Sequence, residues 1–277
     1  MDRKPGWKNM VALVVLGTAC AKTESPKNEA AGPNVVEVIA QDYAFQMPDT
    51  LPAGATTFHL VNKGPSLHHA QLIRLEDNKS LADVAKVDLD REPPPAWMVL
   101  VGGPNPPVPG SDATTSLELT PGNYAVICVI PAADGIVHAA KGMVHALTVV
   151  ASNVARSLPE ADVTLTLNDY SFSFSKPLTA GKHVIKVENI GTQPHEILFG
   201  LLAPGKTPPD LLSWVLKQVG PPPAVPLGGA SNFRPGIVNF VTIDLQPGDY
   251  GIWCFFPDKK DHKPHALHGM MQQIKIT

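Results

Sequence analysis

Two histidines, one cysteine and one methionine occur in each half of this 277-residue sequence, in the same order and at nearly the same spacing. A cysteine thiolate, two imidazoles and a weak thioether are the donor set of a trigonal blue-copper site. The thiolate is a soft donor that stabilises Cu(I), the imidazoles suit both oxidation states, and the thioether tunes the reduction potential. The candidate metal ligands are His68, Cys128, His138 and Met143 in the first set and His195, Cys254, His265 and Met270 in the second.

Some candidates have a competing neighbour of the same type. A gapless alignment of the two halves pairs His68 with His195, which favours His68 over His69. In the second half the competitors His268 and Met271 do not keep the spacing found in the first half. The alternatives for the two cysteines are small buried side chains or a disulfide that joins the halves.

The two sets stay in register with a repeat of the whole sequence at an offset of 126 or 127 residues. Such a long period indicates a duplicated domain rather than a solenoid. We expect a first half at 35–150, a linker at 151–161 and a second half at 162–277. The repeated landmarks are Asp-Tyr-x-Phe from residues 42 and 169, Asn-x-Gly from 62 and 189, and Pro-Gly-x-Tyr from 121 and 247.

Short β-branched or alternating segments separated by turn residues predict an all-β fold, with one sandwich or barrel in each half. Each half also contains an insertion. A helix is expected to begin near Thr207, with an apolar face that runs from Leu211 to Val219, and a shorter counterpart is expected at 80–85. The Pro-rich stretches 104–109 and 221–226 are interpreted as ordered loops that flank the sandwiches. The predicted strands are 35–39, 57–61, 115–119, 147–150, 163–167, 184–187, 241–245 and 273–276.

The pattern Tyr-x-x-x-Cys-x-x-Pro followed by His-x-x-x-Gly-Met, with an upstream Asn-x-Gly and His, resembles the cupredoxin family. The resemblance covers nearly all of the chain after the N-terminal segment, once in each half. It implies two tandem Greek-key β-sandwiches, each with type 1 copper at one end, held by the same eight residues. Nine residues separate Cys128 from His138 and ten separate Cys254 from His265. These loops between the ligands are longer than in plastocyanin, which leaves the exact geometry of the copper sites open.

The N-terminus resembles a targeting segment. Residues 1–19 combine basic residues, a short apolar run and small residues, which is the plan of a signal peptide. Cys20 follows directly, as in the lipobox of bacterial lipoproteins, and 20–34 is a polar tether; plain cleavage after Ala19 is the alternative. We therefore expect an exported protein at the cell envelope, in the periplasm or on the outer surface, anchored to the membrane through lipid on Cys20.

The favoured hypothesis is single-electron transfer between exported redox proteins by up to two type 1 coppers. Copper sequestration, delivery or sensing is the alternative, and a multicopper oxidase-type enzyme and a metal-free binding module are less favoured ones. We expect no enzyme, since the His-x-His pairs of an oxidase and a His beside either cysteine are missing from the sequence. A net charge of −3 with 17% charged residues argues against nucleic-acid binding, and no small-molecule substrate is predicted.

Overall fold

The computed structural model describes residues 1–2, 31–87, 94–217 and 219–277. Residues 3–19 of the expected signal peptide, Cys20 and most of the tether fall outside the described residues. Among the described residues, no helix combines the length and apolarity needed to cross a membrane.

The described part of the first half, 31–87 and 94–150, contains nine strands and a short helix. Its 3₁₀ turn η1 precedes the last strand. The elements are β1 (Asn34–Gln41), β2 (Ala44–Gln46), β3 (Thr50–Pro52), β4 (Gly54–Asn62), β5 (Gln71–Leu75), α1 (Leu81–Val84), β6 (Met98–Gly102), β7 (Asp112–Leu119), β8 (Gly122–Ile127), η1 (His138–Lys141) and β9 (Val144–Val150).

The second half repeats this order, and its described residues, 151–217 and 219–277, contain no counterpart of β3. Its elements are β10 (Val163–Asn168), β11 (Ser171–Phe174), β12 (Gly181–Asn189), β13 (His195–Leu202), α2 (Pro208–Lys217), β14 (Ala224–Phe233), β15 (Val238–Leu245), β16 (Gly248–Trp253), η2 (His265–His268) and β17 (Met271–Ile276).

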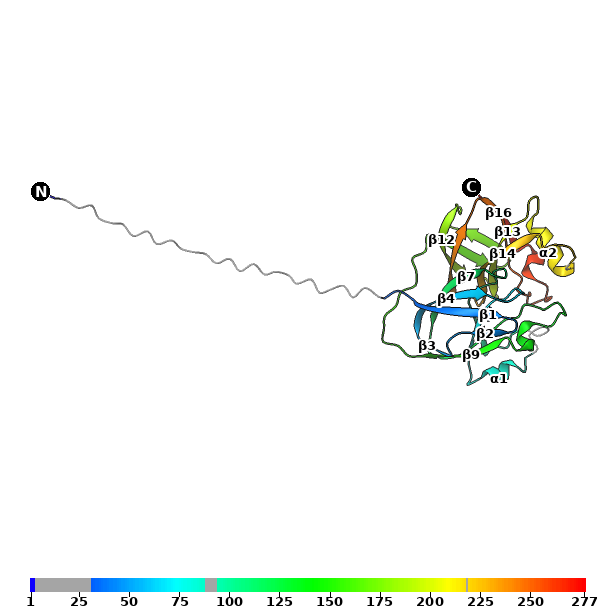
Figure 1. Cartoon of the computed structure of the whole chain (residues 1–277), viewed down its shortest axis with the longest axis horizontal. Coiled ribbons are helices and arrows are strands. Elements are labelled where there is room, and N and C mark those ends of the chain that lie inside the picture. The colour runs from blue at the N-terminus through cyan, green and yellow to red at the C-terminus, as the bar shows by residue number, and fades with distance from the viewer. Residues whose placement is uncertain (3–30, 88–93, 218) are drawn as a thin grey trace.

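The strands form two mixed sheets that run through both halves (Figure 1). One sheet has the order β11-β10-β12-β15-β7-β4-β1-β2, and the other β17-β16-β13-β14-β6-β5-β8-β9-β3. Within each half the first strand pairs in parallel with a later one, β1 with β4 and β10 with β12. Each half is thus a β-sandwich with strands in both sheets, which confirms the expected all-β fold class.

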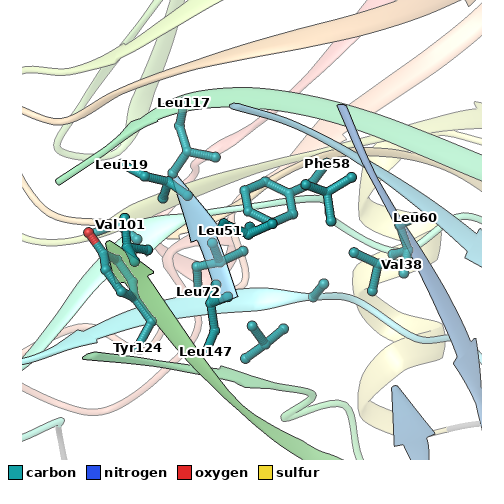
Figure 2. Packing of buried hydrophobic residues seen from close by; sticks show 14 of the residues in the cluster. Val38, Leu51, Phe58, Leu60, Leu72, Val101, Leu117, Leu119, Tyr124 and Leu147 are labelled. Carbon is teal, nitrogen blue, oxygen red and sulfur yellow. The ribbon is translucent and has the colours of Figure 1, made fainter. Parts of the chain in front are cut away.

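Each sandwich encloses its own apolar core. Along β4 and β12 the residues alternate between buried and half-buried positions, because successive side chains of a strand point to opposite faces. Figure 2 shows the core of the first half, where Leu60 of β4 lies beside Val38 of β1, and Leu117 lies beside Leu119 of β7. Each such side chain contributes roughly 1.5–3 kcal/mol when it is fully buried. The core therefore fixes the strand ends that carry the candidate ligands.

The insertions are helical, as the sequence predicted. The Asp210 carboxylate accepts hydrogen bonds from the backbone and hydroxyl of Thr207 at the start of α2. Leu211 is buried, but Val219 lies beyond the end of the helix and is exposed. The predicted apolar face is therefore shorter than expected.

The first Pro-rich stretch, 104–109, does not simply flank its sandwich. Pro104 forms a bridge with Ala230, and Pro107 forms one with Leu227, so the first stretch lies against β14 of the other half. The Gly228 N–H donates to the Pro106 carbonyl at 3.1 Å. Proline lacks an N–H but keeps its carbonyl, so this segment can accept hydrogen bonds across the junction between the two halves. Our interpretation of 104–109 as a flanking loop was wrong on this point.

Candidate metal centres

The upstream histidine of each set is positioned by the Asn-x-Gly turn. The Asn62 side chain accepts the Gly64 N–H at 3.1 Å and donates to the carbonyls of Ser66 and Pro107. Asn189 makes the equivalent bonds to Gly191, Gln193 and Phe233 in the second half. The buried asparagine therefore anchors the loop that leads to the histidine.

A glycine is needed in this turn because the histidine passes close to it. A Cβ on Gly64 would lie 2.6 Å from His68 Nε2, and one on Gly191 would lie 2.7 Å from His195 Nε2. Both distances are too short for a side chain. The third residue of the Asn-x-Gly motif thus makes room for the imidazole.

The cysteine, the downstream histidine and the methionine are held together by backbone hydrogen bonds. In the first half the Cys128 N–H donates to the Met143 carbonyl at 3.2 Å, and the Met143 N–H donates to the His138 carbonyl at 3.0 Å. Gly142 ends the intervening turn with φ 106°, a conformation that favours glycine. Cys254, His265, Gly269 and Met270 repeat this arrangement in the second half.

The structure brings His68, Cys128 and His138 together, and likewise His195, Cys254 and His265. We call these groups site 1 and site 2. At site 1 the two Nδ1 atoms are 3.1 Å apart, and Cys128 Sγ is 3.5 Å from His138 Nδ1. Both cysteines are free thiols, so the disulfide alternative is not realised.

Site 2 has nearly the same dimensions. His195 Nδ1 and His265 Nδ1 are 3.0 Å apart, and Cys254 Sγ lies 3.8 Å from the first and 3.3 Å from the second. Three atoms about 3.4 Å apart lie roughly 2 Å from their common centre, which matches a metal–nitrogen bond length. The buried donors therefore fit one metal ion at each site.

The methionines are buried in the same cores as the cysteines. Met143 and Met270 have no exposed surface, whereas Met271 is partly exposed at the start of β17. His69, the competitor of His68, is outside the site 1 group, and its buried Nδ1 has no hydrogen-bond partner among the described residues. His268 lies beside Asp261, with Nε2 3.1 Å from a carboxylate oxygen.

A carboxylate stands behind each upstream histidine. His68 Nε2 lies 2.5 Å from Asp42 Oδ1, and His195 Nε2 lies 2.8 Å from Asp169 Oδ1. A carboxylate accepts, so each Nε2 carries the proton and Nδ1 is left with a lone pair for a metal. Sequence reasoning found both aspartates in the repeated Asp-Tyr-x-Phe landmark but gave them no role.

The tyrosine of the same landmark covers the downstream histidine. The Tyr43 ring lies 4.9 Å from that of His138, and the Tyr170 ring lies 5.4 Å from that of His265. The Tyr170 hydroxyl donates to Asp258 at 2.5 Å. All four histidines of the two sites are fully buried.

Burial also sets the protonation of the candidate ligands. It lowers the pKa of His265 to about 4 and lowers those of the other three site histidines. The same effect raises the pKa of Cys128 to about 12 and raises that of Cys254 as well. The imidazoles are therefore neutral and ready to bind a metal near pH 7, whereas each thiol must release a proton when a metal binds.

A third cluster lies next to site 2. It consists of Asp258, Asp261 and His268, whose ligand atoms are within 4.8 Å of one another. Sequence reasoning did not find this cluster. Asp258 already accepts hydrogen bonds from Tyr170, Gln193 and the Lys260 backbone. Its carboxylate therefore helps to hold the Tyr170 ring against His265 of site 2.

No protein-family model matches this chain, and no curated protein matches it significantly. Among solved structures, a reduced auracyanin from Roseiflexus castenholzii is 21% identical, covers 43% of this chain and 98% of its own, and has a TM-score of 0.32. A multicopper oxidase is 13% identical over 88% of each chain, with a TM-score of 0.27. A copper nitrite reductase from Nitrosomonas europaea is 13% identical over 89% of this chain and 94% of its own, with a TM-score of 0.26.

These comparisons correct one expectation from the sequence. We expected that the chain is not an enzyme, but the structures that align with almost nine-tenths of it are described as an oxidase and a nitrite reductase. That expectation is contradicted. At TM-scores this low, however, the likeness does not carry the activity of those enzymes over to this chain.

Proposed function

We propose that this chain, with its two cupredoxin-like halves, binds one copper ion in each half and transfers single electrons. The observation that supports this most strongly is the repeated, fully buried group of two Nδ1 atoms and one Sγ atom. In this proposal His68, Cys128, His138 and Met143 hold the first ion, and His195, Cys254, His265 and Met270 hold the second. Bound copper would supply one-electron redox chemistry at each site.

The donor set favours copper over zinc. A structural zinc site has four strong ligands in a tetrahedron. Each site here combines three strong donors with a buried methionine, and a thioether is a weak ligand. That composition suits an ion that alternates between Cu(I) and Cu(II).

The surroundings of the donors favour electron transfer. Asp42 and Asp169 fix the upstream histidines, and backbone hydrogen bonds fix the cysteines and the methionines. Ligands that cannot move need little rearrangement when the charge of the metal changes. A small rearrangement lowers the barrier for gaining or losing an electron.

We further propose that the protein acts after export, held at the cell envelope by lipid on Cys20, and exchanges electrons with exported redox proteins. The basic and apolar residues of 1–19, the small residues before Cys20 and the polar segment that follows support this part of the proposal.

The proposed redox role is tested on copper-loaded protein by electrochemical titration and by the rate of electron self-exchange. We expect a reversible one-electron step at each site and fast exchange. Copper that binds tightly but cannot be reduced and reoxidised reversibly would contradict electron transfer and favour sequestration or delivery.

A further inference from the structure

One side chain of the first half reaches into the surroundings of site 2. Asn105, which is buried at the junction, donates from Nδ2 to Glu196 Oε2 at 3.1 Å and to the Ile197 carbonyl at 3.2 Å. Glu196 directly follows His195, a candidate ligand of site 2. A residue of the first half therefore holds the segment that carries a site 2 histidine.

Glu196 in turn contacts the cysteine of site 2. Its N–H points at Cys254 Sγ at 3.4 Å, and its Oε1 accepts the Phe255 N–H at 2.9 Å. Glu196 thus binds both the sulfur and the residue next to it. Hydrogen bonding at a cysteine sulfur is one of the factors that tune the potential of a copper site.

The same connection continues back towards site 1. The Ala70 N–H donates to the Pro104 carbonyl at 3.0 Å, and Pro104 is covalently joined to Asn105. Ala70 is two residues from His68. Covalent bonds and two hydrogen bonds therefore link the site 1 histidine to Glu196 across the junction.

The repeat does not reproduce this connection in the opposite direction. The counterpart of Asn105 is Ser231, whose hydroxyl donates to the Gly103 carbonyl at 3.1 Å. The counterpart of Glu196 is His69, whose Nδ1 has no hydrogen-bond partner in the part of the chain that the structure describes. Because the two halves are otherwise so alike, the Asn105–Glu196 pair distinguishes site 2 from site 1.

We propose that Asn105 and Glu196 are positioning residues through which the first half sets the reduction potential of site 2, and that they form a route for electrons between the two sites. This inference rests on the proposed function. One electron leaves one site and arrives at the other, no bond forms or breaks, and the total charge is unchanged. Asn105 acts by holding Glu196 in place, so that the Glu196 N–H stays on the Cys254 sulfur.

The experiment compares Asn105→Ala with Ser231→Ala, its repeat counterpart at the same junction, in the copper-loaded full chain. Adding Cys128→Ser or Cys254→Ser leaves one thiolate site, so the potential of each site can be measured alone. We expect Asn105→Ala to lower the potential of site 2 and leave site 1 unchanged, because a weaker N–H bond to the sulfur favours Cu(II). Ser231→Ala should change neither potential.

In chains with both sites intact, flash reduction measures electron exchange between them. Asn105→Ala should slow this exchange several-fold, and Ser231→Ala should not. If circular dichroism shows that Asn105→Ala does not fold, Asn105→Leu replaces it, since leucine keeps a similar volume but lacks the Nδ2 donor.

The outcomes separate the two proposals. Wild-type protein without a thiolate–copper absorption band would overturn the proposed function itself. Two bands in the wild type, with an unchanged or raised site 2 potential in Asn105→Ala, would overturn only the positioning role. Equal effects of Asn105→Ala and Ser231→Ala would also overturn it, because they would indicate a general loosening of the junction.

Discussion

At the scale of single residues, each site depends on side chains that do not themselves face the proposed metal. Asp42 and Asp169 determine which nitrogen of the upstream histidine carries a proton. The Asp42 carboxylate is held by the Ser66 hydroxyl, and the Asp169 carboxylate by Thr192. The imidazole is therefore fixed in both tautomer and orientation before a metal binds.

Replacing Asp42 with alanine should weaken copper binding at site 1 by roughly 10–100-fold, because loss of an outer hydrogen-bond partner has this effect at other metal sites. Competition with a chelator, followed by absorption, measures the affinity of each site. Asp169→Ala is the matched control and should weaken site 2 instead. Equal affinities at both sites in both variants would show that the aspartates do not support the ligands.

The buried thiols predict a loss of stability at high pH in the metal-free protein. The pKa of Cys128 is about 12, above its ordinary value of 9.0, because burial disfavours the thiolate. The folded state therefore keeps a proton that the unfolded state loses, and the free energy of unfolding should fall as the pH rises from 9 towards 12. The expected slope is about 1.4 kcal/mol per pH unit for this thiol.

Urea denaturation at a series of pH values measures this slope. The variant Cys128→Ser lacks the titrating group, so its stability should fall less steeply than that of the parent protein. Identical slopes in the two proteins would contradict the assigned burial of the thiol.

At the scale of elements, the turns between strands determine whether the ligands can meet. The Asn-x-Gly turn leaves no room for a side chain beside the histidine, and the η1 and η2 turns bring each methionine back to its cysteine. These turns follow strands whose ends are fixed by the cores. The spacing of the ligands in the sequence is therefore a consequence of strand and turn geometry.

Gly191→Ala tests this dependence at site 2. The added Cβ would lie 2.5 Å from Asp169 Oδ1 and 2.7 Å from His195 Nε2, so the hydrogen bond between these groups must break or shift. We expect a loss of about 1–3 kcal/mol of stability and weaker copper binding at site 2 alone. Thermal unfolding and copper titration measure the two effects.

Gly32→Ala is the control, because a Cβ there would meet nothing within 4 Å. It should leave both properties unchanged. If Gly191→Ala behaved like this control, the close approach of the turn would have no importance for the site.

The sequence predicted the strands and turns of each half better than the contacts between the two halves. Repeated turn residues and period-two alternation located the strands, and a shared offset placed His68 and Cys128 in one group, because local patterns determine strand ends. The contact of Pro104 with Ala230 was not predictable, since pairing between distant segments depends on the packing of both sandwiches. Asp42 was found as a landmark, but its bond to His68 depends on the fold of the turn.

At the scale of the whole molecule, the two halves form one structure. Strand β7 pairs with β15 and β6 pairs with β14, so each sheet continues from one half into the other. Thr115 lies opposite Val241, its counterpart in the repeat, which indicates an approximate two-fold axis between the halves. Asn239 strengthens the junction, with its buried side chain bonded to Gly103 and Val101. Two similar sites therefore share one continuous framework of sheets.

We propose that this framework holds two copper ions through two thiolates. The most direct test is a copper titration of the chain, followed by visible absorption, alongside Cys128→Ser and Cys254→Ser. We predict an intense thiolate–copper band that saturates at two ions per chain. Each variant should lose the part of this absorption that comes from the site of the replaced cysteine. A folded protein that develops no such band, or a variant whose band keeps the full intensity of two sites, would contradict copper binding through both thiolates.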